Sequence, residues 1–369
     1  MQNMTVTTRA MYQAATSGTL SVQEAVRLLR QEMKPRTLPE KLQRFAKGRD
    51  LRALLAEGFK RNHPDKKPES MDRKVRDWFG GKDRALRKED ALEVCFILGL
   101  TVEEADELLM LLVEEGFHWR SPEEIVFIYA LQKGLDYPAA CALNERMQPL
   151  LKGFSAQGKE EAFTAVVRSQ VAAIENEAQL AEYLAHAAAQ LGRFHNTAYS
   201  LFMEYMGLLE EGGVADLLED ASAMTTREVV EQYFHRRFVP PAKGDKASAA
   251  LSAIQRSIQA AWPDEIAISR MKNRAADVTR KVMILLFIAT DGGFSDEDEE
   301  LLDEWEETSV FEDAYARLND MLALCGFSPL DPRAPFDWMM LYCLCVEDIF
   351  DVDAQMAAFL ETLFAAGDA

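Results

Sequence analysis

The chain has 369 residues, of which 48% are hydrophobic and 28% charged, a composition that can bury a core and excludes wholesale disorder. Its net charge of −20 opposes a uniformly basic nucleic-acid-binding protein. No apolar run approaches the about 18 residues of a membrane span, and the N-terminus lacks the pattern of a signal peptide. We therefore expect a cytoplasmic protein with no membrane partner, whose five cysteines are mostly buried small hydrophobic residues.

Four capping boxes mark predicted helix starts along the chain. In each, a Ser or Thr hydroxyl accepts a hydrogen bond from the backbone three residues on, while a Glu carboxylate reaches back. The pairs are Ser21 with Glu24, Thr101 with Glu104, Ser121 with Glu124, and Thr225 with Glu228. Apolar residues recur at helical spacing behind these caps, and alternating β-branched runs bounded by hairpin turns do not occur. The sequence therefore predicts an all-α fold.

Breaks in the helical pattern divide the chain into four predicted regions. Residues 1–37 form a helical lead-in that ends near Pro35, and residues 38–147 hold a basic segment followed by acidic helices. Residues 148–237 form a helical middle domain. The Pro- and Gly-containing stretch at 238–245 is the predicted linker, and residues 246–369 form a C-terminal helical domain.

Two parts of the chain are alike. Residues 105–131 and 318–344 each show an apolar helix, a Gly-Phe pair, a turn that contains Pro, and a helix that ends aromatic-x-Leu. Upstream of them, residues 84–99 and 274–289 also resemble each other. Two interpretations stay open: a duplicated helical module whose second copy has lost its basic face, or a chance likeness between amphipathic helices.

A basic segment interrupts the acidic chain. Between Leu38 and Lys88, 16 Lys and Arg stand against 8 Asp and Glu, which leaves −28 on all other residues together. Such a segment fits either of two roles: an electrostatic footprint for phosphates, or docking against the protein's own acidic remainder.

The segments LRALLAEG (51–58) and VRDWFGGKDRALRKEDALEVCFILGLTVEEADELL (75–109) follow a distinctive order. A first helix precedes a helix ending in aromatic-x-x-Gly-Lys, a loop, a helix ending in Leu-Gly-Leu, and a last helix with an acidic start. In this order, residues 48–112 resemble the Cro/XRE-type, phage-repressor-like helix-turn-helix family. The resemblance implies a DNA-binding module. The family's second helix should fall near residues 60–70, where Pro64 and Pro68 oppose a regular helix, so a degenerate module that keeps only the fold stays open.

The predicted recognition helix has an apolar and a basic side. Val75 and either Trp78 or Phe79 are expected to pack on the helix of Leu92 and Phe96, while the basic residues point outward. Under the basic side we expect one apolar cluster of Trp78, Leu92, Phe96, Leu108 and Leu112. Arginine suits the O6 and N7 acceptors of guanine, and Lys or Arg suits phosphate, which the residues after the helix would contact. The predicted DNA-binding residues are Arg73, Lys74, Arg76, Lys82, Arg84, Arg87 and Lys88.

Catalytic and metal-binding patterns are not found. The five histidines are scattered without ligand spacing, Cys343-x-Cys345 is no Cys-x-x-Cys motif, and no glycine loop for phosphate occurs. The acidic block at 296–307 has the spacing of an amphipathic helix, and the aromatic stripe at 195–206 favours core packing over a ligand pocket. We therefore predict no enzyme, no catalytic residue, no metal and no cofactor.

Two functions of different classes follow. The favoured hypothesis is a non-enzymatic, DNA-binding transcriptional regulator whose acidic helices form a homo-oligomer or sense a signal. The alternative is a protein–protein interaction adaptor, associated with mobile elements or phage defence, that uses a degenerate helix-turn-helix fold. Exposure of Arg73, Arg76 and Lys82 on one face would favour the first, and burial against acidic helices the second.

Overall fold

The computed structural model describes residues 6–33, 35–80, 86–151, 164–187, 191–192, 194–211, 223–235, 252–290, 310–346 and 351–365. Within these ranges the backbone forms helices and no strand, and the only β-type pairing is one antiparallel bridge between Glu115 and Phe327. The predicted all-α class is confirmed. The chain divides into two compact units. Unit 1 comprises Met1–Pro35, Thr197–Cys325 and Pro329–Ala369, and unit 2 comprises Arg36–Asn196 and Gly326–Ser328.

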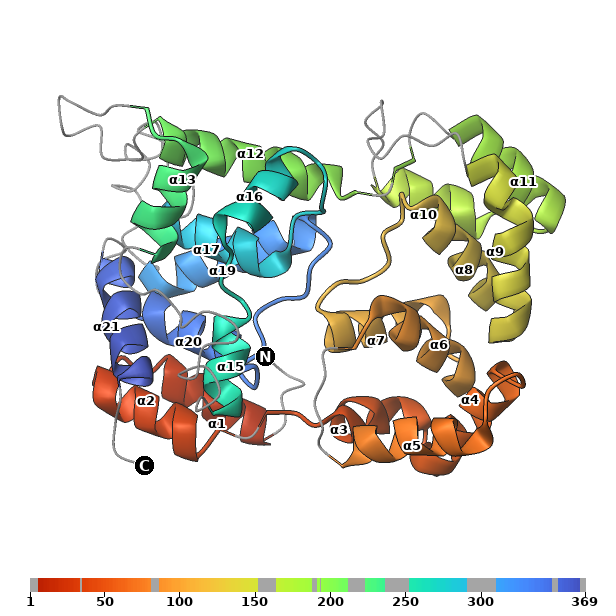
Figure 1. Ribbon diagram of the computed structural model, residues 1–369, viewed down its shortest axis with the longest axis horizontal. Coiled ribbons are helices and arrows are strands. Elements are labelled where there is room, and N and C mark those ends of the chain that lie inside the picture. The colour runs from red at the N-terminus through yellow and green to blue at the C-terminus, as the bar shows by residue number, and fades with distance from the viewer. Residues whose placement is uncertain are drawn as a thin grey trace. The chain divides into compact units, whose positions relative to one another are not determined.

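Unit 2 contains the basic segment and the helices that follow it (Figure 1). Its elements are α3 (Leu38–Gln43), the 3-10 turn η1 (Arg44–Ala46), α4 (Leu51–Asn62), α5 (Pro68–Phe79), α6 (Lys88–Leu98), α7 (Val102–Val113), α8 (Pro122–Gln132), α9 (Tyr137–Leu151), α10 (Thr164–Ala172) and α11 (Glu177–His186). One apolar core runs through them, and α6 lies at its centre with every residue from Ala91 to Leu98 buried. The short link from α6 to α7 depends on Gly99, whose φ of 67° favours glycine.

Unit 1 is assembled from both ends of the chain. Its elements are α1 (Val6–Ala15), α2 (Val22–Gln31), α12 (Asn196–Glu210), α13 (Thr226–Val229), the π-helical turn η3 (Val230–His235), α15 (Ala253–Gln259), α16 (Glu265–Lys272), α17 (Arg280–Ala289), α19 (Val310–Leu324), α20 (Pro335–Leu344) and α21 (Val352–Phe364). The N-terminal helices α1 and α2 pack against α20 and α21 (Figure 1).

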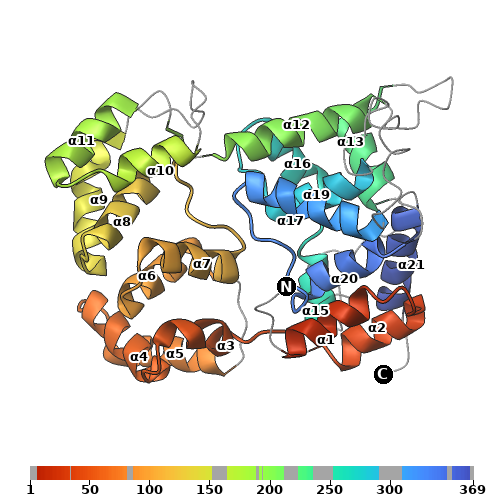
Figure 2. The ribbon, with the colours of Figure 1, turned by 180° about the vertical axis from the view of Figure 1, so that it is seen from behind.

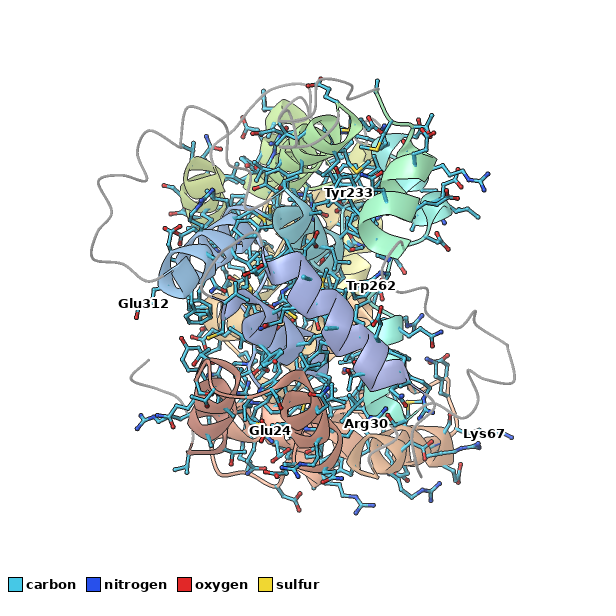
Figure 3. The ribbon with its side chains drawn as sticks, turned by 90° about the vertical axis from the view of Figure 1, so that its left-hand side faces the viewer. Glu24, Arg30, Lys67, Tyr233, Trp262 and Glu312 are labelled. Atoms are coloured by element: carbon cyan, nitrogen blue, oxygen red, sulfur yellow. The ribbon has the colours of Figure 1, made fainter. Side chains whose placement is uncertain are left out.

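Polar contacts fix the N-terminal helices in unit 1. The Trp338 indole Nε1 donates a hydrogen bond to the Met11 carbonyl at 2.9 Å, and the Tyr342 hydroxyl donates to the Leu20 carbonyl at 3.1 Å. The Arg30 guanidinium, labelled in Figure 3, donates to the Leu363 carbonyl near the end of α21. Trp338 and Tyr342 are buried, and α1 and α2 themselves bury Met11 and Leu29, so both helices are part of the unit's core.

The units differ in part from the four regions expected from the sequence. The expected boundary after residue 37 lies close to the division at Pro35 and Arg36. The expected middle domain, 148–237, is shared between the units, which divide it after Asn196. Residues 1–37, expected as a lead-in, instead supply two helices to unit 1. The predicted linker at 238–245 lies outside the described residues.

Candidate nucleic-acid interface

The candidate interface is built by α4, a turn and α5. Asp50 caps α4 by accepting hydrogen bonds from the amides of Arg52 and Ala53, and the helix ends at Asn62. Residues 63–67 form the turn, and Pro68 occupies the first turn of α5, where proline is favoured. The segment at 60–70 therefore contributes no separate helix, as its two prolines had indicated, and α4 is followed directly by α5.

Close packing holds α4 and α5 together on α6 (Figure 2). The rings of Phe59 and Trp78 meet edge to face with centroids 5.3 Å apart, and Val75 of α5 is buried. Gly58 allows the approach of α4 to α6, because a Cβ atom there would lie 2.5 Å from a methyl group of Ile97. The expected cluster is confirmed: Leu92, Phe96 and Leu108 belong to this core, and Trp78 and Leu112 pack against it.

A buried carboxylate anchors the turn between α4 and α5. Glu93 of α6 is buried, and the Asn62 side-chain amide donates to its Oε1 at 3.0 Å. The His63 Nε2 lies 3.0 Å from the same oxygen. Burying a carboxylate without partners is costly, so these contacts determine where α4 ends. Sequence patterns did not predict this anchor, because Glu93 lies within an apolar helical run and its partners are at the end of α4 and in the turn that follows it.

Three of the predicted DNA-binding residues point outward. Arg73 and Arg76 of α5 are exposed, and neither has an ion-pair partner among the described residues. Arg87, which precedes α6, has a side chain 77% exposed and lies 3.5 Å from the Asp90 carboxylate. Arg73 and Arg76 share one side of the helix, because residues three apart are neighbours on a helical surface.

Lys74 was expected to point outward and Lys88 to contact phosphate, whereas the structure places both ammonium groups against carboxylates of unit 2. The Lys74 Nζ lies 2.8 Å from the Asp90 Oδ1 and 4.1 Å from the centroid of the Phe59 ring, so it faces α4 and α6. The Lys88 Nζ lies 2.8 Å from Glu124 and 3.1 Å from Glu115. Long aliphatic stems let lysines pack inward while the ammonium groups find carboxylates, which helical spacing alone does not reveal.

The charge of Lys88 is maintained by its partners. Burial alone would lower the pKa of this lysine, but attraction to Glu124 and Glu115 outweighs burial and raises the pKa above its ordinary value. Lys88 is therefore a structural cation. The remaining two predicted residues, Lys82 and Arg84, lie outside the described residues.

We give the name α5 face to four exposed basic residues of α5 and of the turn before it: Lys66, Lys67, Arg73 and Arg76. All four are exposed, and Lys67, labelled in Figure 3, projects away from the helices. Lys67 is also the N-cap of α5, and its side chain makes no capping hydrogen bond. The partial positive charge of the helix N-terminus therefore adds to the charge of the two lysines. Exposed Asp65 and Glu69 lie beside them in sequence and reduce the net charge.

One histidine pair, not expected from the sequence, also lies in unit 2. The rings of His118 and His195 stack with centroids 4.1 Å apart, and His195 contacts the Phe327 ring at 5.7 Å. Among the residues that the structure describes, no three His, Cys, Asp or Glu side chains are grouped to hold a metal ion.

Comparisons with family models, with curated proteins and with solved structures find no match to this chain. Within the described part of the chain, no helix is both long and apolar enough to cross a membrane.

Proposed function

We propose that unit 2 binds duplex DNA through the α5 face and that the protein is a non-enzymatic, cytoplasmic transcriptional regulator. The observation that carries the proposal is the exposure of Arg73 and Arg76 on one side of a helix whose other side is fixed to the core. A guanidinium presents two parallel N–H donors that match guanine in the major groove. Lys66 and Lys67, at the start of the helix, suit phosphate contacts that position it.

Rigid attachment of α5 supports this function. The edge-to-face contact of Trp78 with Phe59, the Lys74–Asp90 ion pair and an ion pair of 2.7 Å between Lys60 and Asp72 connect α5 to α4 and α6. A helix held in this way presents its arginines without a further cost of ordering the backbone on binding. Because one such helix contacts few base pairs, the proposal includes a homo-oligomer that presents two α5 faces.

The test is a salt titration of binding between the full-length protein and a fluorescent duplex pool. Each phosphate contact releases condensed counterion, so affinity should fall steeply with salt concentration. Arg73→Ala and Arg76→Ala should each weaken binding to a selected sequence by about 1–3 kcal/mol, and weaken binding to random duplex less. Arg227→Ala in unit 1, a side chain 69% exposed, is the matched control and should bind as wild type does.

A protein-binding module is the second candidate. Two of the predicted contact residues, Lys74 and Lys88, are engaged by carboxylates of unit 2, and exposed Glu69 and Asp72 lie on α5 beside the arginines. A mixed-charge helix face of this kind suits a protein partner. If the well-folded protein shows no salt-sensitive binding to any duplex pool, that result would favour this candidate over the regulator.

A further inference from the structure

Two side-chain-to-backbone hydrogen bonds recur in both units at identical sequence spacing. In unit 2, Asp106 of α7 accepts from the Phe117 amide, eleven residues on, at 2.6 Å. In unit 1, Asn319 of α19 accepts from the Leu330 amide, also eleven residues on, at 2.9 Å. Each bond fixes the segment of chain that follows its helix.

The second recurrent bond lies directly after the first. The Glu124 carboxylate of α8 accepts from the His118 amide, six residues before it, at 2.7 Å. The Asp337 carboxylate of α20 accepts from the Asp331 amide, again six residues before it, at 2.8 Å. Both carboxylates follow a proline in the first turn of their helix, Pro122 or Pro335.

The same two carboxylates hold the same kind of cation. Lys88, the first residue of α6, pairs with Glu124 at 2.8 Å, and Arg280, the first residue of α17, pairs with Asp337 at 2.8 Å. Amphipathic periodicity alone does not explain three matched polar interactions on matched helices. It determines where apolar residues fall and specifies no polar partner. The likeness between residues 105–131 and 318–344 therefore extends from the sequence to its polar contacts.

The two groups of helices that share these contacts, α5–α9 and α16–α21, are called here the first and the second framework. They differ at the helix that carries the α5 face. The helix before α6 is α5, which ends at Phe79 with Gly80 as its C-cap, and the helix before α17 is α16, which ends at Lys272 with Asn273 as its C-cap. Aligning the two helix ends matches buried Val75 with buried Ile268. The same alignment places Ile266, 70% exposed, at the position of Arg73, and Ser269 at that of Arg76.

The buried anchor is also confined to the first framework. Aligning the first residues of α6 and α17, Lys88 and Arg280, matches Glu93 with Leu285, which is buried and apolar. The carboxylate that fixes the α4–α5 turn thus has no counterpart in α17. The first framework carries both the arginines and the carboxylate that positions their helix, and the second carries neither.

We propose that α5–α9 and α16–α21 are two copies of one helical module and that only the first copy retains a nucleic-acid-binding face. The chain then has one duplex-binding surface, and a regulator built from it needs a second chain to contact a second half-site. The statement about binding rests on the proposed function, whereas the duplication rests on the matched hydrogen bonds and ion pairs alone.

Exchange of the equivalent ion pairs tests the duplication without DNA. Lys88→Arg with Glu124→Asp places the second copy's pair in the first, and a shared framework should accept it with a melting temperature within about 2 °C of wild type. Lys88→Ala, which leaves Glu124 without its cation, should lower the melting temperature by about 6 °C or more. An exchanged pair as damaging as Lys88→Ala would overturn the duplication.

A second exchange tests the duplication at another position, in case the Lys88→Arg, Glu124→Asp pair is strained for a local reason. Asp106→Asn imports the residue found at Asn319 and keeps the oxygen that accepts from the Phe117 amide, whereas Asp106→Ala removes it. The proposal requires Asp106→Asn to melt well above Asp106→Ala. Equal loss from both variants would count against a shared framework.

A DNA-binding measurement tests whether the α5 face is the chain's one duplex-binding surface. In full-length protein, the variant with both Arg73→Ala and Arg76→Ala should bind the selected sequence tenfold or more weakly than wild type does. Undiminished binding would place a duplex-binding surface elsewhere and overturn the single-surface statement. Absence of binding by the wild-type protein would instead reject the proposed function, and the melting experiments would still decide the duplication.

Discussion

Lys74 and Asp90 connect α5 to α6 through an ion pair of 2.8 Å, although Lys74 lies between two exposed arginines in sequence order. The lysine ammonium also lies 4.1 Å from the Phe59 ring centroid and 5.1 Å from that of Trp78. A cation between two aromatic rings and a carboxylate fixes the rotation of α5 about its own axis. That rotation decides which residues of α5 face outward.

Replacing Lys74 should therefore affect stability more than it affects binding chemistry. Lys74→Met keeps the aliphatic stem and removes the charge, so the free energy of unfolding should fall by about 1.5–3 kcal/mol, the usual value of a hydrogen bond to a charged group. Denaturant unfolding measures this loss. Lys66→Met, at an exposed position, is the control and should leave stability within about 0.5 kcal/mol of wild type.

Phe96 should be among the costliest residues to truncate in unit 2. Its ring is 8% exposed and meets the rings of Phe127 and Tyr137 at 6.2 and 5.8 Å. Phe96→Ala should lower the free energy of unfolding by about 3–5 kcal/mol, because the loss of buried surface adds to the cost of the cavity. A folded variant with an unchanged melting temperature would contradict this packing.

The Arg280–Asp337 pair should show strong coupling in unit 1. Both side chains are 3% exposed, and Arg280 also donates to the Pro329 carbonyl at 3.0 Å. Removing either charge alone should cost about 3–5 kcal/mol, since the other stays buried without its partner. A double-mutant cycle with Arg280→Met and Asp337→Leu should therefore give a double variant less destabilised than the sum of the single variants. Strict additivity would mean that the two charges act independently.

The five thiols should react in two groups. Cys95, Cys325 and Cys343 are buried, and burial raises the pKa of each thiol, that of Cys325 to about 12. Cys141 and Cys345 are partly exposed. A thiol-reactive chromophore at about pH 8 should therefore modify Cys141 and Cys345 first and the other three only after denaturation. Rapid labelling of Cys343 in the native protein would contradict the described packing of α20.

Acid should weaken the cap of α7. Hydrogen bonds from Lys47 and from the Thr101 amide lower the pKa of Glu104 below its ordinary value of 4.5. A carboxylate with a lowered folded pKa stabilises the fold above its unfolded pKa, and this stabilisation is lost as pH falls through the folded pKa. Between about pH 5 and pH 3, wild type should lose more thermal stability than Glu104→Gln, and parallel pH profiles would exclude this role.

Local sequence signals predicted local structure well. The capping boxes of Ser21, Thr101 and Thr225 form as expected. Ser121 accepts from the Glu124 amide, but the Glu124 carboxylate binds the His118 amide and Lys88 instead of reaching back to Ser121. A capping pattern spans four residues and cannot show that a cation on another helix competes for the same carboxylate.

Contacts between distant residues account for what the sequence did not predict. The outward positions of Arg73 and Arg76 followed from helical spacing, but the inward position of Lys74 depends on Asp90 of another helix. Likewise, residues 1–37 read as a lead-in because their partners, such as Trp338, lie near the other end of the chain. Periodicity identifies which face of a helix is buried, and it contains no information about which segment covers that face.

The path of the chain through unit 1 sets an order of events during synthesis. The helices α1 and α2 leave the ribosome long before α20 and α21, on which they pack, are made. At typical rates of roughly 5–20 residues per second, the apolar sides of α1 and α2 stay uncovered for on the order of 15–70 s. Almost all of unit 2 lies in the sequence between these two pairs of helices, so most of its core can fold during that interval. A nascent chain halted before α20 should therefore hold a largely folded unit 2 beside an N-terminal pair of helices exposed to chaperones and proteases.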